Sequence, residues 1–154
     1  MNPDSIILEL AAPARALACA SVYRETRSHS LSYLPEIHSK TDDEHFFQDR
    51  VFPEDTVWVA LDENRTVVGF VAFGEGWVNH LYVLPEFQSR GIGRRLLEIA
   101  KQDATSLKLL TFERNTHARH FFERHGFTVV HHTDGADNEE LEPDLLMEWR
   151  RPVD

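Results

Sequence analysis

The sequence predicts an α+β domain built on a mixed central sheet of about six or seven strands, flanked by helices. Two observations lead to this prediction. Three segments rich in β-branched and aromatic residues, 57–61, 66–73 and 77–84, follow one another across short turns, as in an antiparallel meander. Strands and helices alternate only after this run, which adds parallel pairing to the sheet. A length of 154 residues fits one domain spanning residues 1–154.

The residues before the meander predict one strand followed mostly by helix. Residues 6–11 are predicted to form the first strand, and residues 13–27 the first helix, because Pro13 suits a first turn. Residues 29–52 mix proline, aromatic and acidic side chains and predict one or two short helices with a connecting loop. Cys19, the single cysteine, lies on the first predicted helix, where we expect a small buried side chain and not a nucleophile.

The residues after the meander predict alternating helices and strands. Residues 92–104 have helical spacing, with Ile92 and Leu96 on one apolar face. Asn115 is a good N-cap for the following helix, and Gly126 suits its left-handed end. The remaining predicted strands are residues 107–112, 127–132 and 145–150.

The overall charge restricts the class of partner. The chain has 26 acidic and 16 basic residues and a formal net charge of -10, which argues against a nucleic-acid binder. No apolar run approaches the ~18 residues of a membrane span, and the first residues lack the basic region of a signal peptide. A single cysteine is compatible with a reducing compartment. We therefore expect a cytoplasmic protein with no nucleic-acid or membrane partner.

One glycine-containing loop predicts an anion site. Residues 88–95 read Gln-Ser-Arg-Gly-Ile-Gly-Arg-Arg and open the predicted helix at residues 92–104. Glycine lets the backbone approach a ligand closely, and the first amides of a helix have no partner inside that helix. Together with three arginines, these amides indicate a site for a phosphate-bearing ligand.

Two well-known phosphate motifs fit this loop poorly. A nucleotide P-loop needs Lys and Ser or Thr after its last glycine, but Gly93 is followed by Arg94 and Arg95. A dinucleotide fingerprint needs a third glycine where this chain has Leu96, although Glu113 lies about twenty residues on, where a ribose-binding acid is expected. Because of the two glycines and Glu113, a nucleotide-binding oxidoreductase is one functional hypothesis, although the motif fits it poorly.

A third motif fits much better. The stretches at residues 81–85, 87–94 and 96–97, followed by Asn115, Ala118, Phe121-Phe122 and Gly126-Phe127, resemble the acetyl-CoA site of the GNAT (Gcn5-related N-acetyltransferase) superfamily. The resemblance covers residues 78–128 and implies the GNAT acyl-CoA N-acyltransferase fold. It also implies that the following residues hold acetyl-CoA: Leu81, Tyr82, Val83, Gln88, Ser89, Arg90, Gly91, Ile92, Gly93, Arg94, Asn115 and Phe122.

The resemblance also implies a reaction. An acetyl group would pass from acetyl-CoA directly to a primary amine while both substrates are bound. The acceptor would be a small amine, a peptide N-terminus or a lysine, and the protein a monomer or homodimer. The pantetheine arm of the cofactor would pair with residues 81–83 as an added half-strand, and the Val83 amide would polarise the thioester carbonyl.

The residues that handle protons are less clear from the sequence. Many GNAT members have a tyrosine acid at the position of Phe122, which carries no hydroxyl. The catalytic candidates are Tyr33 as an acid, and His80 or Glu113 as the base that takes the proton of the amine. His80 could equally be a structural histidine of its strand, and Glu113 a solvated loop acid. A non-catalytic CoA-binding or regulatory module therefore remains an alternative.

Two further features received a structural and a functional interpretation. The histidines at 117, 120, 131 and 132 do not assemble into a closed metal geometry, so no metal site is predicted. Residues 134–144 contain six acids and no base, in a connection that borders the acceptor pocket in GNAT proteins. An acidic rim would attract a cationic amine, whereas a solvated loop would have no such role.

Overall fold

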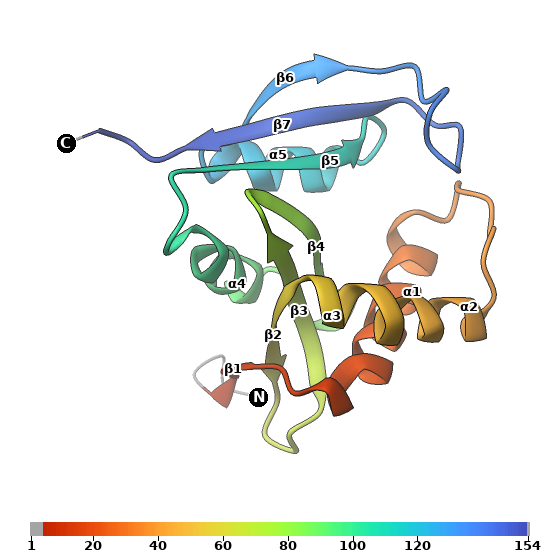
Figure 1. Ribbon diagram of the computed structural model, residues 1–154, viewed down its shortest axis with the longest axis vertical. Coiled ribbons are helices and arrows are strands. Elements are labelled where there is room, and N and C mark those ends of the chain that lie inside the picture. The colour runs from red at the N-terminus through yellow and green to blue at the C-terminus, as the bar shows by residue number, and fades with distance from the viewer. Residues whose placement is uncertain (1–4, 154) are drawn as a thin grey trace.

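The computed structural model describes residues 5–153 and contains a seven-stranded mixed sheet with the strand order β1-β2-β3-β4-β5-β7-β6 (Figure 1). The strands are β1 (Ile7–Leu10), β2 (Thr56–Leu61), β3 (Val67–Gly74), β4 (Trp77–Val83), β5 (Ser106–Phe112), β6 (Thr128–His132) and β7 (Asp144–Arg150). The helices are α1 (Ala16–Ser30), α2 (Lys40–Phe46), α3 (Phe52–Glu54), α4 (Ile92–Lys101) and α5 (Thr116–Arg124). The predicted fold class and strand number are confirmed.

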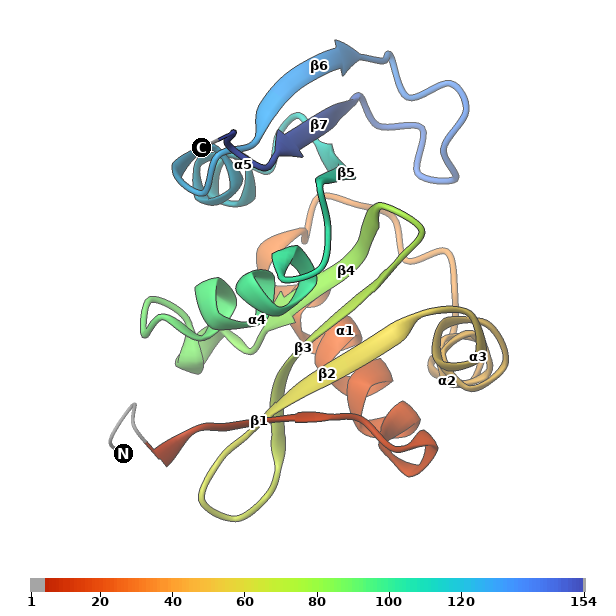
Figure 2. The same ribbon diagram turned by 60° about the vertical axis from the view of Figure 1, so that its left-hand side comes forward.

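The predicted meander forms the first half of the sheet. Strands β1 to β4 pair antiparallel in order, and the register places Val59, Phe70 and Tyr82 side by side across β2, β3 and β4. Because side chains alternate along a strand, these three share one face of the sheet. Helix α1 covers that half on one side and α4 covers it on the other (Figure 2).

The predicted helix after the glycine loop forms as α4. Its residues Ile92, Leu96 and Leu97 are buried, as the helical spacing requires. Gly91 precedes it with a φ of 82°, in the left-handed region that glycine adopts without strain. The helix ends at Lys101, three residues before the predicted boundary at 104.

The second half of the sheet is held by β7. This strand pairs antiparallel with β5 along its whole length and with β6 on its other side. Helix α5 packs against this half (Figure 1), begins at the N-cap Asn115 and is followed by Gly126, whose φ is 92°. Both predicted end signals of α5 are therefore present.

The segment between β1 and β2 differs in detail from the prediction. A 3₁₀ turn at Pro13–Arg15 precedes α1, which continues to Ser30, and a π-helical turn at Phe47–Val51 joins α2 to α3. Cys19 on α1 is fully buried, and burial raises the pKa of its thiol to about 12, so it is an inert side chain as predicted. Over residues 5–153, no helix combines the length and apolarity needed to cross a membrane.

Candidate active site

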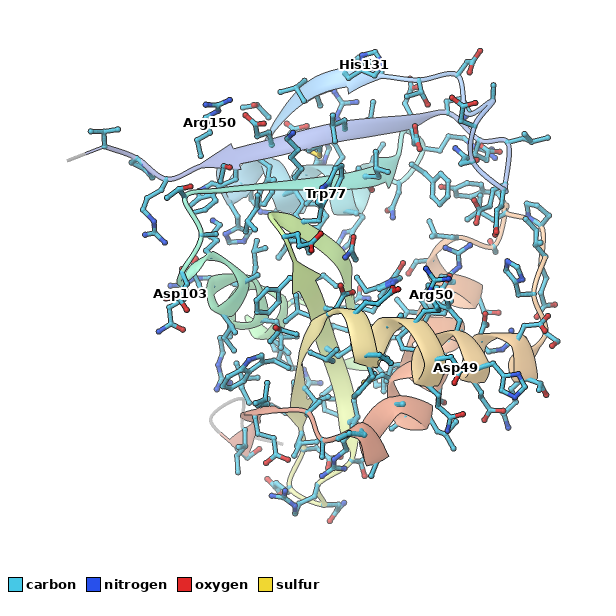
Figure 3. All side chains as sticks on the ribbon, viewed as in Figure 1. Asp49, Arg50, Trp77, Asp103, His131 and Arg150 are labelled. Carbon is cyan, nitrogen blue, oxygen red and sulfur yellow. The ribbon has the colours of Figure 1, made fainter. Side chains whose placement is uncertain are left out.

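The central feature of the site is a separation between β4 and β5. These two parallel strands pair only at Trp77 and Lys108, where the Lys108 amide donates to the Gly76 carbonyl at 2.8 Å. Figure 3 shows Trp77 at this junction, and Figure 2 shows the two halves of the sheet diverging away from it. Beyond the junction, the edge of β4 at residues 81–83 has no pairing with β5, so its backbone groups face an opening.

A cavity of about 460 Å³ lies at this opening. It is bounded by α1, the C-terminal part of β4, the glycine loop and α5. Its lining includes Arg27, Leu81, Tyr82, Val83, Gln88, Ser89, Gly91, Gly93, Arg94, Asn115, Phe121, Phe122 and Arg124. Most of the predicted cofactor residues are therefore gathered around one cavity.

The glycine loop turns sharply and lies close to α5. Gly93 lies in the first turn of α4, and a Cβ there would come within 3.3 Å of the Phe121 ring. Ser89 has a φ of 63°, in the left-handed region, so the backbone turns sharply there. The Gln88 side chain donates from Nε2 to the Val83 carbonyl at 2.8 Å, and so ties the loop to the free edge of β4.

The three arginines of the loop do not gather at one anion site, contrary to the prediction from their positions in the sequence. Only Arg94 lines the cavity. The Arg90 guanidinium lies 5.3 Å from the Phe87 ring centroid, and Arg95 donates to the Ile6 carbonyl at 3.2 Å, which secures the chain just before β1. Helix periodicity explains the difference, since Arg94 and Arg95 point about 100° apart around α4.

A second, smaller cavity of about 260 Å³ adjoins the first. We call the first the donor cavity and the second the acceptor cleft. The cleft lies along the separation of β4 and β5, with Asn79 and His80 on one side and Leu110 and Asp144 on the other. The residues that line both spaces are Leu31, Leu81, Tyr82, Asn115, Ala118 and Phe122. A ligand in each space would meet its neighbour at these residues.

His80 lies on the same face of β4 as Tyr82, two residues before it in regular register, and a bulge lies between His80 and Val78. The register shifts between Ala72 and Phe73, so that His80 pairs with Ala72 while Val78 pairs with Phe73. The imidazole lies among aromatic rings, with centroids 5.6 Å from Phe47 and 5.8 Å from Tyr23. Its Nδ1 is covered and has no hydrogen-bond partner. Burial, and to a lesser extent the charge of Arg27, lowers the pKa of His80 to about 4.

The other two catalytic candidates lie elsewhere. Glu113 is exposed in the loop after β5, and it lines neither cavity. Tyr33 also lines neither cavity, and its ring lies under Arg114 at 3.9 Å. Its hydroxyl is enclosed and unpaired among the described residues, and burial raises its pKa. The structure therefore brings only His80 of the three to the cleft.

The acidic connection before β7 is partly neutralised by ion pairs. Glu139 meets His38 at 2.7 Å, Glu140 meets Arg27 at 3.2 Å, and Glu142 meets Arg114 at 2.6 Å. Asp144 accepts hydrogen bonds from the Thr133 hydroxyl and from Asn138. Three of the six acids thus hold the connection against α1 and its neighbouring loops, and the predicted acidic rim is weaker than its composition indicates.

Helix α1 contributes a residue to the site that no sequence motif marks. Arg27 lines the donor cavity from this helix, with its guanidinium carbon 5.1 Å from the centroid of the Tyr23 ring. No local motif marks Arg27, because a single arginine near the end of an amphipathic helix is ordinary.

In the described part of the chain, no group of three or more side chains is arranged to hold a metal ion.

Known proteins share this sequence pattern and fold. A family model described as an acetyltransferase (GNAT) domain matches residues 53–129, half of the chain. The peptidyl-lysine N-acetyltransferase YjaB of Salmonella typhimurium is 32% identical over 85 residues, which are 55% of this chain and 59% of that protein. The peptidyl-lysine N-acetyltransferase YiaC of Escherichia coli is 32% identical over 94 residues, which are 60% of this chain and 62% of that protein. The matches thus span about three fifths of the length of these curated relatives.

The fold comparison agrees with the family match. The structure of yncA from Salmonella typhimurium, solved with its cofactor acetyl-CoA, superposes with a TM-score of 0.72 at 18% identity, covering 97% of this chain and 95% of that one. At this identity the likeness concerns the fold. The family match covers residues 53–129, and the glycine loop lies within them. The chain therefore belongs to the GNAT acetyltransferase family.

Proposed function

We propose that this protein is an acetyl-CoA-dependent N-acetyltransferase that transfers the acetyl group directly to a primary amine. The observation that carries the proposal is the pair of adjoining cavities at the separation of β4 and β5. One cavity is built around a helix N-terminus and a glycine loop, which suit a pyrophosphate. The other opens on the same six residues from the acceptor side, so both substrates could be bound at once.

The donor cavity supplies three kinds of contact to acetyl-CoA. The amides of residues 89–94 and the Arg94 side chain, which lines the cavity, are proposed to receive the pyrophosphate. The free edge of β4 offers backbone groups to the amides of the pantetheine arm, as a strand would. The Val83 amide then lies where it can polarise the thioester carbonyl, and this donor stabilises the oxyanion that forms on attack.

His80 is proposed as the proton acceptor in the cleft. Its lowered pKa keeps the imidazole neutral. Because Nδ1 is covered, Nε2 is proposed as the nitrogen that accepts the proton. Free ammonium is far too weak an acid for such a base, so the amine must release its first proton to solvent. Once the nitrogen has attacked the carbonyl it becomes much more acidic, and a neutral imidazole can then accept its second proton.

A lysine side chain is the proposed acceptor. The two curated relatives named above are peptidyl-lysine N-acetyltransferases, and we carry their acceptor class over to this chain. Ion pairs engage three of the six acids of the connection before β7, which reduces the negative charge that would attract a cationic amine from a distance. The acceptor is therefore proposed to be selected mainly at the cleft itself, where His80 and Asn79 line one side.

One observation favours a second candidate function. Phe122 carries no hydroxyl, and neither Glu113 nor Tyr33 lines the cleft, so the set of proton-handling groups expected from the family is incomplete. A non-catalytic CoA-binding or regulatory module would tolerate that loss. The two candidates differ in one measurable property, which is thiol release from bound acetyl-CoA in the presence of an amine.

Calorimetry and a thiol-release assay test both proposals. Titration with acetyl-CoA, CoA and NAD should give binding of the first two only. Thiol release should then be followed with lysine-containing peptides, free lysine and an acidic amino acid as acceptors. Binding of NAD without CoA would overturn the cofactor assignment. Acetyl-CoA binding without thiol release for any amine would support the regulatory module.

A matched pair of substitutions tests the donor cavity. Gly93→Asp places a carboxylate against the proposed pyrophosphate site, and we expect at least about a tenfold loss of CoA affinity from charge repulsion. Gly76→Asp adds the same charge in the turn between β3 and β4, where a Cβ would meet no atom within 4 Å, and should leave affinity unchanged. Equal affinities in the two variants would place the pyrophosphate elsewhere.

A further inference from the structure

The proposed reaction needs a source for one proton. When the tetrahedral intermediate collapses, the carbon–sulfur bond breaks and CoA leaves as a thiolate. A thiolate is a tolerable leaving group, but protonation as it departs still lowers the barrier. Phe122, which is 9% exposed and packs against Phe121 and Phe127, cannot donate that proton. The donor must therefore come from another element.

Tyr82 lies where such a donor is required. Among the described residues that line both the donor cavity and the acceptor cleft, it is the only one with an ionisable proton. Its strand position, one residue before Val83, keeps it next to the amide proposed to bind the thioester carbonyl. The residue as a whole is half-buried, and it borders both open spaces.

The surroundings of the hydroxyl suit a proton donor. The positive charge of Arg27, which also lines the donor cavity, acts on this hydroxyl, and a guanidinium has no acceptor that could take up the hydroxyl proton. Glu140 fixes Arg27 at 3.2 Å from the opposite side. Burial raises the pKa of Tyr82, so the proton is held at neutral pH, while the adjacent guanidinium favours the tyrosinate once the proton has left.

We propose that Tyr82 is the general acid of this protein and takes the place of the tyrosine that many relatives carry where this chain has Phe122. This inference rests on the proposed acetyltransferase function. The amine nitrogen forms a bond to the acetyl carbon, the carbon–sulfur bond breaks, and the Tyr82 hydroxyl proton passes to sulfur. The tyrosinate, stabilised by Arg27, regains a proton from solvent. One acetyl-CoA and one ammonium thus give one amide, one free CoA and one released proton.

The other two tyrosines do not meet these conditions. Tyr23 contacts the ring of Tyr82 at 5.3 Å and lies within reach of Arg27, but it lines neither the donor cavity nor the acceptor cleft. Tyr33 lies under Arg114, outside both spaces. Tyr23 is therefore a matched control, since Tyr23→Phe removes the same hydroxyl from a neighbouring buried ring.

The test compares steady-state kinetics and cofactor binding in these variants. Tyr82→Phe should lower kcat by about tenfold to a hundredfold, within or just below the usual contribution of a general acid. Its KM for acetyl-CoA and its calorimetric affinity for CoA should stay unchanged, because the ring is kept. Tyr23→Phe should keep kcat. In the Tyr82→Phe background, Phe122→Tyr should restore part of the rate, since it returns a hydroxyl to the junction of the two cavities.

The outcomes separate this inference from the proposed function. Thiol release by the unsubstituted protein with an unchanged kcat in Tyr82→Phe would overturn the role of Tyr82 and leave the function standing. Equal losses in Tyr82→Phe and Tyr23→Phe would also overturn it, because they would indicate a general effect of the aromatic cluster. Acetyl-CoA binding without thiol release by the unsubstituted protein would remove both proposals.

Discussion

The buried imidazole of His80 predicts a specific loss of stability in acid. In the folded protein its pKa is about 4, against an ordinary value of 6.5. The cause is mainly burial among the rings of Tyr23, Phe46, Phe47 and Tyr82, with a smaller contribution from the positive charge of Arg27. The unfolded chain therefore binds a proton at His80 at pH values where the folded chain does not.

The sign and the size follow from these two pKa values. A histidine whose pKa is lowered by folding contributes its full share of stability above pH 6.5, and that share is lost as the pH falls toward 4. At pH 5 the loss is about 2 kcal/mol, and it approaches about 3 kcal/mol below pH 4, since one pKa unit corresponds to 1.36 kcal/mol. A loss of this size is a large part of the stability of a typical domain.

The assay compares urea unfolding of the unsubstituted protein with that of His80→Phe between pH 4.5 and 8. Subtracting the two free energies of unfolding removes the contributions of the groups that both proteins share. The free energy of unfolding of the unsubstituted protein minus that of His80→Phe should be constant above pH 7. Below pH 6.5 this difference should decrease, because only the unsubstituted protein loses stability through His80. A difference that stays constant down to pH 4.5 would refute the buried, neutral imidazole, and with it the argument for His80 as a proton acceptor.

Two further predictions concern the ends of α5. Gly126→Ala adds a Cβ to a residue in the left-handed conformation, and this Cβ would lie 3.0 Å from Cδ1 of Trp149. The substitution should therefore lower the free energy of unfolding by more than the ~1–2 kcal/mol that backbone strain alone would cost. Gly76→Ala is the control, because Gly76 has a similar φ of 83° but no atom lies within 4 Å of an added Cβ. Equal losses of thermal stability in the two variants would contradict a steric effect of Trp149. Asn115→Ala removes the acceptor of the Ala118 amide at 3.3 Å and should cost about 1 kcal/mol, whereas Asn115→Ser should retain most of it; equal losses would contradict the capping role.

Several parts of the site follow from neighbouring residues and could be predicted from the sequence. The left-handed turn at Gly91 and the apolar face of α4 depend on local conformation and on helical periodicity. The N-cap Asn115 and the antiparallel order of β2, β3 and β4 have the same local origin. These elements lie within the sequence pattern of the GNAT family, so the cofactor side of the site could be predicted from the sequence.

The groups that handle protons could not be predicted in the same way. His80 owes its lowered pKa to burial among rings from α1, the segment at 46–47 and β3, which come from other parts of the chain. Arg95, placed in the phosphate cluster by its sequence position, faces Ile6 instead. The sequence alone does not show that three of the acids before β7 form ion pairs. Their partners are Arg27, His38 and Arg114, which come from other parts of the chain.

The sequence by itself determined the secondary structure around the glycine loop, the sheet class and the family, because periodicity, turn chemistry and capping depend on residues close together in the chain. Only the tertiary structure decided which side chains meet at the separation of β4 and β5. That separation depends on where two strands stop pairing, and it places Tyr82 at the junction of two cavities while leaving Tyr33 and Glu113 outside them. Burial and the approach of distant charges, which set the chemistry of these groups, exist only in the packed chain.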